Sequence, residues 1–375
     1  MLGTNLTTGG AQQVLLNLAG WLHARGIPVR AVFMYDRDGL ADAWQARYPF
    51  PIVCLDAWKK DGTVAQRLIK FIPGWLQLVQ WMRREKFNAV LTFTHDANII
   101  GLPAAWLAGI PRRFGSDHNR YPSLTKTRIR LHRWIINSPI AHGLVAVSKF
   151  TQAEAIEEGI HPQRIYVIHN GVLPVNPDGS RARALRQELL AGKEGFLVLS
   201  VGRLAPQKAL HILIHAADLV LKVYPQALFC LAGEGPQRLA LETLIREKEL
   251  ERSVQLLGNR GDVAELMAAA DLFVLSSSSE GLPMALLEAL ACGMAVATTA
   301  IGGVADVIAD GETGLLAPVD DPEALAGVIC RALGDKQLRQ RLGTAGKKLI
   351  EKNFSLDIMG EHYLQLLSHE LKTRS

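Results

Sequence analysis

Cysteine is scarce in this 375-residue chain, and the four cysteines are far apart. Cys54, Cys230, Cys292 and Cys330 form no Cys-x-x-Cys pair. This spacing favours buried, reduced thiols over a metal site or a disulfide framework. The sequence therefore predicts no metal ligand set.

Long hydrophobic runs are also missing. The most apolar stretch, residues 284–309, is interrupted by Glu288, Asp306 and several glycines, so we expect no helix that spans a bilayer. The N-terminus shows no basic region followed by an apolar run and a small-residue cleavage site. We therefore expect a cytoplasmic protein, with peripheral contact at the inner face of the cytoplasmic membrane as an open alternative.

Acidic residues are few in the first half. Residues 1–180 hold 20 Lys/Arg against 12 Asp/Glu, whereas residues 181–375 hold 21 against 24. The basic residues concentrate in 59–86 and 112–133. A pI near 9.0 is compatible with a protein that binds nucleic acid. The sequence has no recognised nucleic-acid-binding motif, however, so we expect no nucleic-acid partner.

Apolar runs alternate with helical-period segments along almost the whole chain, which predicts an α/β protein with parallel sheets covered by helices. Its length favours two domains. The predicted strands are 28–34, 51–55, 89–93, 111–115, 142–147 and 164–168, then 196–202, 227–233, 254–258, 272–277 and 294–299. The predicted helices of the first half are 11–24, 64–86, 97–108, 123–137 and 149–158.

The region between the two series of strands is rich in Pro, Gly and charge. We predict an N-terminal domain over 1–172, a linker over 173–195, a C-terminal domain over 196–352 and a final helical segment over 353–375. Two successive open α/β domains imply a cleft between the carboxyl edges of their sheets, where such folds bind ligands.

The most informative stretch lies between Glu280 and Glu288. A serine-rich loop leads into a helix whose first turn we expect to hold Pro283. The backbone N–H groups of Gly281, Leu282, Met284 and neighbouring residues would then point off a positive helix end, which suits an anion. One carboxylate lies on either side of that anion, so a ligand with a central phosphate and hydroxyls at both ends would fit.

Two permanent cations follow the predicted strand 196–202. Arg203 and Lys208 stand between that strand and a helix, and such a pair suits a diphosphate. A solvated loop with two surface cations is the alternative for this segment alone. Residues 233–236, Gly-Glu-Gly-Pro, follow the next strand, where turns are common, but three strand ends with polar loops in this half favour a ligand site.

The first half offers two further candidates. Gly9 and Gly10 begin a helix after a polar loop, which allows close approach of a ligand, although such pairs are often structural. His118 follows the predicted strand 111–115, where it would face the second domain; an ordinary surface histidine is the alternative. His95, which precedes Asp96 at the end of the preceding strand, is a weaker candidate for the site.

With these residues in view, the chain resembles the family 4 retaining glycosyltransferases of the GT-B fold, in which two Rossmann-like domains face each other across a cleft. The resemblance extends over nearly the whole length. Its pieces are GGAQQVLLNLA near the start, SDHN at 116–119, IHNGV at 168–172, VGRLAPQK at 201–208, AGEGP at 232–236, LLGNRGDV at 256–263, 280–308 and 311–326. Glu-x7-Glu together with Gly-Arg-x4-Lys is the specific part of the match.

The resemblance implies a role for each site residue. Arg203 and Lys208 would neutralise the diphosphate of a UDP- or GDP-linked sugar, without a metal or other cofactor. Glu288 would bind the ribose and Glu280 the transferred sugar. The backbone of Gly281, Leu282, Pro283 and Met284 would contact sugar and phosphate, Gly10 would approach the β-phosphate, and His118 would line the reacting centre.

The sequence departs from the family pattern at two places. Ala209 stands where the family usually has glycine, and the chain starts at Met1 about where the first strand should be ending. We therefore expect most of that strand to be missing, either because the start is assigned too late or because the sheet has only a stub there. The final helices, after Phe354 and Ser355, resemble the segment that returns to the N-terminal domain.

The function implied is transfer of a sugar to an acceptor hydroxyl with retention, in surface polysaccharide or lipid-linked glycan synthesis. A glycoside hydrolase, which also uses two carboxylates, and a non-catalytic sugar-nucleotide-binding protein are the alternatives. In 71–86, Trp75, Leu78, Val79 and Met82 recur at helical spacing. They predict core packing or, alternatively, contact with anionic lipid near a lipid-linked acceptor.

Overall fold

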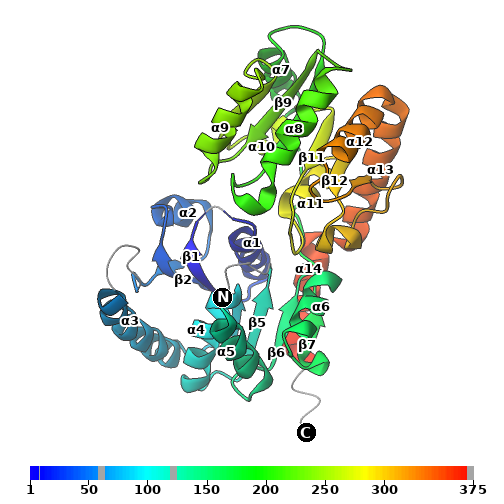
Figure 1. Cartoon of the computed structure of the whole chain (residues 1–375). Helices are drawn as coiled ribbons and strands as arrows, with labels where there is room; N and C mark the ends of the chain where they lie inside the picture. The colour runs from blue at the N-terminus through cyan, green and yellow to red at the C-terminus, as the bar shows by residue number, and fades with distance from the viewer. Residues whose placement is uncertain (8, 58–63, 119–124, 370–375) are drawn as a thin grey trace. The chain divides into compact units, whose positions relative to one another are not determined.

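The chain folds into two compact units, each built on its own parallel sheet (Figure 1). The computed structural model describes residues 1–7, 9–57, 64–118 and 125–369. The N-terminal unit comprises Met1–Gly171 and Leu356–Ser375, and the C-terminal unit comprises Val172–Ser355. The predicted class, α/β with two doubly wound parallel sheets, is confirmed.

The N-terminal unit has a seven-stranded sheet in the order β3-β2-β1-β4-β5-β6-β7. The order reverses between β1 and β4, as in a Rossmann-like sheet. Its strands are β1 Leu2–Leu6, β2 Ala31–Asp36, β3 Ile52–Cys54, β4 Ala89–Phe93, β5 Arg112–Asp117, β6 Gly143–Ala146 and β7 Ile165–Val167.

The first strand departs from the expectation of a stub. β1 has five residues and pairs with both central neighbours, β2 and β4. Leu2 and Leu6 are fully buried. Its register with β4 covers Leu2 and Gly3, opposite Thr92 and Phe93. Polar residues separate the two leucines of β1, so the strand is not a continuous apolar run and was not predicted from the sequence.

Helices connect these strands and supply the apolar side chains that cover the sheet. They are α1 Gly10–Ala24, α2 Ala41–Arg47, α3 Val64–Glu85, α4 His95–Leu107, α5 Lys126–Asn137, α6 Lys149–Glu157, the 3-10 turn η1 Pro162–Arg164 and α14 Leu356–His369. Local chemistry sets several of their starts. Ser148, for example, caps α6 in a reciprocal capping box with Thr151.

The last helix, α14, packs in the N-terminal unit although it ends the chain. The indole Nε1 of Trp21 on α1 donates a 2.6 Å hydrogen bond to Asp357, and Arg25 pairs with the same carboxylate at 2.9 Å. The close packing depends on Gly360, because a Cβ there would lie 2.4 Å from the Trp21 ring.

The apolar stripe of α3 lies in the core of the N-terminal unit. Leu78, Val79 and Met82 are buried, and Trp75 packs against them while its Nε1 donates to the carbonyl of Ile100 at 2.9 Å. Core packing, one of the two predictions for this stripe, is confirmed for these four residues; contact of the segment with lipid stays a prediction. Across the described helices, none combines the length and apolar character needed to cross a bilayer.

The C-terminal unit has a six-stranded sheet in the order β10-β9-β8-β11-β12-β13, which reverses between β8 and β11. Its strands are β8 Phe196–Val201, β9 Ala227–Ala232, β10 Val254–Gly258, β11 Leu272–Leu275, β12 Val296–Thr299 and β13 Leu315–Ala317. Its helices are α7 Gly179–Leu189, η2 Pro206–Lys208, α8 Leu210–Leu221, α9 Arg238–Glu247, α10 Val263–Ala269, α11 Met284–Ala291, η3 Gly302–Asp306, α12 Pro322–Gly334 and α13 Lys336–Asn353.

The segment predicted as a linker, 173–195, holds α7, which packs against α10 inside the C-terminal unit. On the sheet, α8 packs against α9 and α12, and α11 packs against α13. One continuous apolar cluster joins α8, α9, α12 and the first half of α13 to the strands.

Candidate active site

The candidate site of the C-terminal unit lies at the carboxyl ends of β8 and β11. These strands pair in parallel at the centre of the sheet, where the strand order reverses. Ligands of doubly wound sheets bind at this point because the loops on either side diverge there. The loop after β8 carries Arg203 and Lys208, and the loop after β11 carries Glu280.

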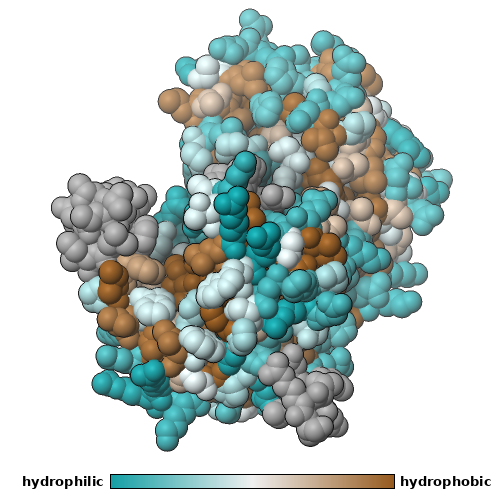
Figure 2. All heavy atoms as spheres, turned by 60° about the horizontal axis from the view of Figure 1, so that its bottom comes forward, coloured by the Kyte–Doolittle hydropathy of each residue, from teal (hydrophilic) through white to brown (hydrophobic). Residues whose placement is uncertain are grey.

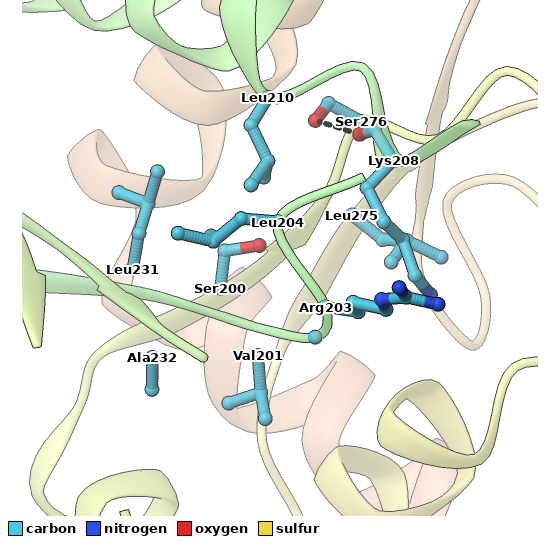
Figure 3. A pocket seen from close by; sticks show the side chains of 11 residues that line it. Ser200, Val201, Arg203, Leu204, Lys208, Leu210, Leu231, Ala232, Leu275 and Ser276 are labelled. Atoms are coloured by element: carbon cyan, nitrogen blue, oxygen red, sulfur yellow. Dashed lines mark hydrogen bonds between the residues drawn. The ribbon is translucent and has the colours of Figure 1, made fainter. Parts of the chain in front are cut away.

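Arg203 and Lys208 line one small pocket, together with Ser200, Gly202, Leu204, Leu231, Leu275, Ser276 and neighbours. Figure 3 shows the nitrogen-bearing ends of the two side chains close together. Lys208 ends the short turn η2, and the next residue, Ala209, adopts a left-handed backbone with φ of 44°. That turn sends the chain into α8 while leaving Lys208 at the pocket.

The Lys208 ammonium forms an ion pair with the Glu280 carboxylate. Glu280 is 9% exposed, and its Oε1 also accepts a 3.1 Å hydrogen bond from Ser277 Oγ. Ser277 is held in turn by Thr299 Oγ1, which donates to its carbonyl at 2.6 Å. The carboxylate predicted to bind the sugar therefore contacts one of the cations predicted to bind the diphosphate.

Backbone and hydroxyl bonds join the loops after β8 and β11. Ser276 Oγ donates to the carbonyl of Lys208 at 3.0 Å, and the backbone N–H of Ser278 donates to the carbonyl of Gln207 at 2.9 Å. Within the described residues, Arg203 forms no ion pair, and it is exposed. The site thus presents one paired and one unpaired cation.

The glycine-rich loop after β9 packs against the loop that carries Arg203, and its predicted contact with a ligand stays a prediction. A Cβ at Gly233 would lie 1.9 Å from the Gly202 carbonyl oxygen, and one at Gly235 would lie 2.3 Å from that of Leu204. Glu234 turns to Arg238 in an ion pair. These glycines let the β9 loop pack directly against the backbone that carries Arg203.

Helix α11 begins one residue later than predicted. Pro283 is its N-cap, with an extended ψ of 121°, and Met284 is the first helical residue. The first N–H groups of an α-helix have no intrahelical acceptor, so this end carries the positive potential that an anion requires. Gly281 to Met284 are buried. Gly303 packs directly against Gly281, and a Cβ added at Gly303 would lie 1.4 Å from the Gly281 carbonyl oxygen.

Glu288 lies just over one turn into α11. Burial raises the pKa of its carboxyl from 4.5 to about 7. Among the described residues no side chain hydrogen-bonds to it, and it does not line the pocket of Arg203 and Lys208. Hydrogen bonds from the hydroxyl groups of a ligand would stabilise the charged form of such a buried carboxylate.

The other two predicted site residues, Gly10 and His118, belong to the N-terminal unit. Gly10 is the exposed first residue of α1. His118 stacks on Phe93, with ring centroids 5.6 Å apart, and its Nε2 lies 3.1 Å from Ser116 Oγ. Tyr363 of α14 also hydrogen-bonds to Ser116, and burial lowers the pKa of His118 to about 4, so that the imidazole is neutral.

The structure thus brings together Arg203, Lys208 and Glu280, with the start of α11 on the same loop. Sequence reasoning missed Ser277 and Thr299, which fix the Glu280 carboxylate. Only their position in a serine-rich loop and at a strand end could have indicated them.

Comparison with known families covers most of both units. Residues 8–174 match the family model described as Glycosyltransferase Family 4. Residues 182–349 match the model described as Glycosyl transferases group 1. The second match includes every predicted site residue of the C-terminal unit.

Two curated relatives illustrate the range of similarity. One is UDP-Gal:alpha-D-GlcNAc-diphosphoundecaprenol alpha-1,3-galactosyltransferase of Escherichia coli, 28% identical over 72% of this chain and 73% of that protein. The other is the lipopolysaccharide core biosynthesis glycosyltransferase LpsD of Rhizobium meliloti, 25% identical over 98% of this chain and 97% of that protein. Alignments with some others are shorter: LpsE of the same species is 34% identical, but the match covers 53% of its length.

Among solved structures, Anabaena Alr3699/HepE in complex with UDP-glucose superposes with a TM-score of 0.86. Identity is 23% over 98% of this chain and 99% of that one. WaaG, a glycosyltransferase involved in lipopolysaccharide biosynthesis, gives a TM-score of 0.76 at 22% identity over 98% and 100% of the two chains. At this identity the likeness concerns the fold.

Proposed function

The chain belongs to the family 4 glycosyltransferases of the GT-B fold, and from this we propose that it transfers a sugar from a nucleoside diphosphate sugar to an acceptor hydroxyl with retention. The observation that carries the proposal is the convergence of Arg203, Lys208 and Glu280 at the switch point of the C-terminal sheet. The proposed donor is a uridine diphosphate sugar. HepE was crystallised with UDP-glucose, and the E. coli relative is named for UDP-galactose.

The proposed chemistry follows from where charge develops. As the bond between sugar and diphosphate breaks, negative charge builds on the phosphate and positive charge on the sugar ring. Arg203, Lys208 and the start of α11 would stabilise the departing diphosphate more than the intact donor, which lowers the barrier. Two fixed cations supply the charge that a divalent ion supplies in other enzymes, so we propose that transfer needs no metal ion.

Glu280 has two tasks in this proposal. Its pairing with Lys208 holds the ammonium at the pocket before the donor arrives. When the diphosphate takes up part of the Lys208 charge, Glu280 is left to accept hydrogen bonds from hydroxyls of the sugar. Ser277 keeps the carboxylate in place through this exchange. Glu288 would accept hydrogen bonds from the nucleotide ribose.

We propose a glycan of surface polysaccharide or lipid-linked oligosaccharide synthesis as acceptor. Relatives named for lipopolysaccharide core biosynthesis and for a diphosphoundecaprenol-linked sugar support this choice. His118, neutral and next to Ser116, would line the reacting centre from the N-terminal unit.

Peripheral membrane contact through α3 would bring the enzyme to a lipid-linked acceptor. Ile72 and Leu76, one turn apart on α3, are 54% and 50% exposed, and Arg83 and Arg84 lie in the last turn. Figure 2 shows hydrophobic side chains reaching the surface among polar ones. An apolar pair followed by cations suits anionic lipid. Replacing both Ile72 and Leu76 by Gln should reduce co-sedimentation with phosphatidylglycerol vesicles; unchanged co-sedimentation would reject this surface.

The function is tested with radiolabelled UDP-glucose, UDP-galactose and GDP-mannose, offered with lipid-linked saccharide acceptors. We expect sugar transfer from one UDP-sugar, unchanged when Mg²⁺ or Mn²⁺ is added or omitted, with an anomeric configuration by NMR equal to that of the donor. Free sugar released from a glycoside without nucleotide would indicate a hydrolase. UDP binding with no transfer from any donor would indicate a binding protein.

A further inference from the structure

A cluster of three metal-ligating side chains lies inside the N-terminal unit, outside the donor site described above. His95 begins α4, His132 is in the middle of α5, and Glu158 follows the end of α6. One donor atom from each of the three lies within 4.8 Å of the others. The two imidazole rings contact each other, with centroids 4.1 Å apart.

Burial makes this cluster unusual. His95 is 5% exposed and His132 is fully buried, and the Glu158 side chain is 7% exposed. Both ring nitrogens of His95 and Nδ1 of His132 have no hydrogen-bond partner among the described residues. Buried polar atoms are nearly always satisfied by protein, water or an ion, so three such nitrogens in one place require an explanation.

The geometry points to a buried binding site for a transition-metal ion of the zinc class, with His95, His132 and Glu158 as ligands. Two imidazoles and one carboxylate form a familiar ligand set for Zn²⁺, and a fourth position is left for water. His132 Nδ1 lies 3.9 Å from Glu158 Oε2. Ligand atoms around a tetrahedral zinc are separated by roughly 3.5 Å, so the side chains need to move only slightly to bind the ion.

A second carboxylate supports this arrangement. Asp117 Oδ2 lies 3.9 Å from Nε2 of His132, the nitrogen that would face away from the metal. Zinc-bound histidines commonly direct that nitrogen to a carboxylate, a backbone carbonyl or water.

Such an ion would join three helices of the N-terminal unit. α4, α5 and the end of α6 each supply one ligand, and Asp117 is next to His118. The role of the ion is therefore structural. It would hold these three helices in place next to the end of β5, which precedes His118. The inference does not depend on the proposed sugar transfer, because none of its ligands belongs to the donor site.

The test measures metal directly in the full-length protein, purified with a tag that contains no histidine. We expect about one equivalent of bound zinc by mass spectrometry of the metal content. After removal of the metal, titration with Co²⁺ should give visible d–d absorption that saturates near one equivalent, and Zn²⁺ should displace it. Zn²⁺ at 100 times its Kd should raise the Tm by about 5 °C or more.

His95→Ala and Glu158→Gln should each reduce the Co²⁺ absorption and abolish the Zn²⁺-dependent rise in Tm. His161→Gln, at an exposed position in the same unit, is the matched control and should change neither. UDP binding, measured on the same samples, reports whether the C-terminal unit is folded. If the wild-type protein contains no zinc and binds Co²⁺ no better than the His95 and Glu158 variants do, the proposal is overturned.

Discussion

Lys208 pairs with Glu280 across the two central strands of the C-terminal sheet. The two residues follow β8 and β11, which are hydrogen-bonded neighbours. A buried carboxylate next to an ammonium is costly to leave unpaired, so the pair fixes the positions of both groups before a ligand binds.

Ser277→Ala removes the hydroxyl that donates to Glu280 Oε1. The loss of one buried hydrogen bond should reduce the free energy of unfolding by about 1 kcal/mol. It should also lower kcat roughly tenfold, since the carboxylate is less firmly oriented. Ser278→Ala is the control, because Ser278 is exposed and its hydroxyl bond of 3.3 Å goes to the Gln207 carbonyl. Equal effects of the two substitutions on turnover would contradict a special role for Ser277.

Gly235→Ala places a Cβ 2.3 Å from the Leu204 carbonyl oxygen. Backbone on both sides must then shift, so we expect the protein to lose about 2 kcal/mol or more of stability and UDP to bind more weakly, because the loop that carries Arg203 moves. Gly261→Ala is the matched control, since a Cβ there meets nothing within 4 Å. Calorimetry with UDP and urea unfolding measure both effects. Normal UDP affinity in the Gly235 variant would show that this loop does not support the site.

Glu288→Gln should change the dependence of stability on pH. Burial raises the pKa of Glu288 from 4.5 to about 7, so the folded protein holds a proton there that the unfolded chain loses. Wild-type stability therefore falls as pH rises from about 4.5 to about 7, by about 3 kcal/mol in total. Glutamine carries no proton to lose, so the variant should be more stable than wild type at pH 8 and nearly equal to it at pH 4.

Urea unfolding at both pH values measures this difference. Glu247→Gln, on an exposed part of α9, is the control and should shift stability little at either pH. If the Glu288 variant differs from wild type by the same amount at pH 4 and pH 8, the carboxyl is not perturbed as described.

Replacing each of two glycines in helix interiors by alanine should change the stability of the protein in opposite directions. Gly327 on α12 is exposed, and a Cβ there meets nothing within 4 Å. Gly327→Ala should therefore stabilise the protein by up to about 1 kcal/mol through helix propensity. Gly360→Ala should destabilise it, because its Cβ would lie 2.4 Å from the Trp21 ring and separate α14 from α1. Thermal unfolding of both variants distinguishes propensity from packing; stabilisation by both would mean that α14 is not tightly docked.

Most of the fold could be predicted because the strands of parallel sheets are continuous apolar runs. The predicted strand 196–202 is β8, Phe196–Val201, and the predicted 89–93 is β4. Two strands were not predicted. β1 holds polar residues between its leucines, and β13, Leu315–Ala317, has only three residues, although β3 and β7 of the same length were predicted.

The candidate site could be predicted by residue type but not by contact. Arg203, Lys208 and Glu280 follow from their places after strands, whereas the pairing of Lys208 with Glu280 depends on which strands are neighbours. The glycines after β9 were predicted to approach a ligand, and the sequence could not show that they also pack against the backbone on either side of Arg203. His95, His132 and Glu158 come from three helices with no common spacing, so only the folded chain brings them together.

The central claim is that Arg203 and Lys208 hold a diphosphate, and comparison of UDP with UMP tests it most directly. Isothermal titration of wild type should show that UDP binds at least tenfold more tightly than UMP, a difference of about 1.4 kcal/mol. In Arg203→Ala and Lys208→Ala this preference should shrink or disappear, while Lys222→Ala, exposed at the end of α8, should retain it. An undiminished preference for UDP in both site variants would contradict the account.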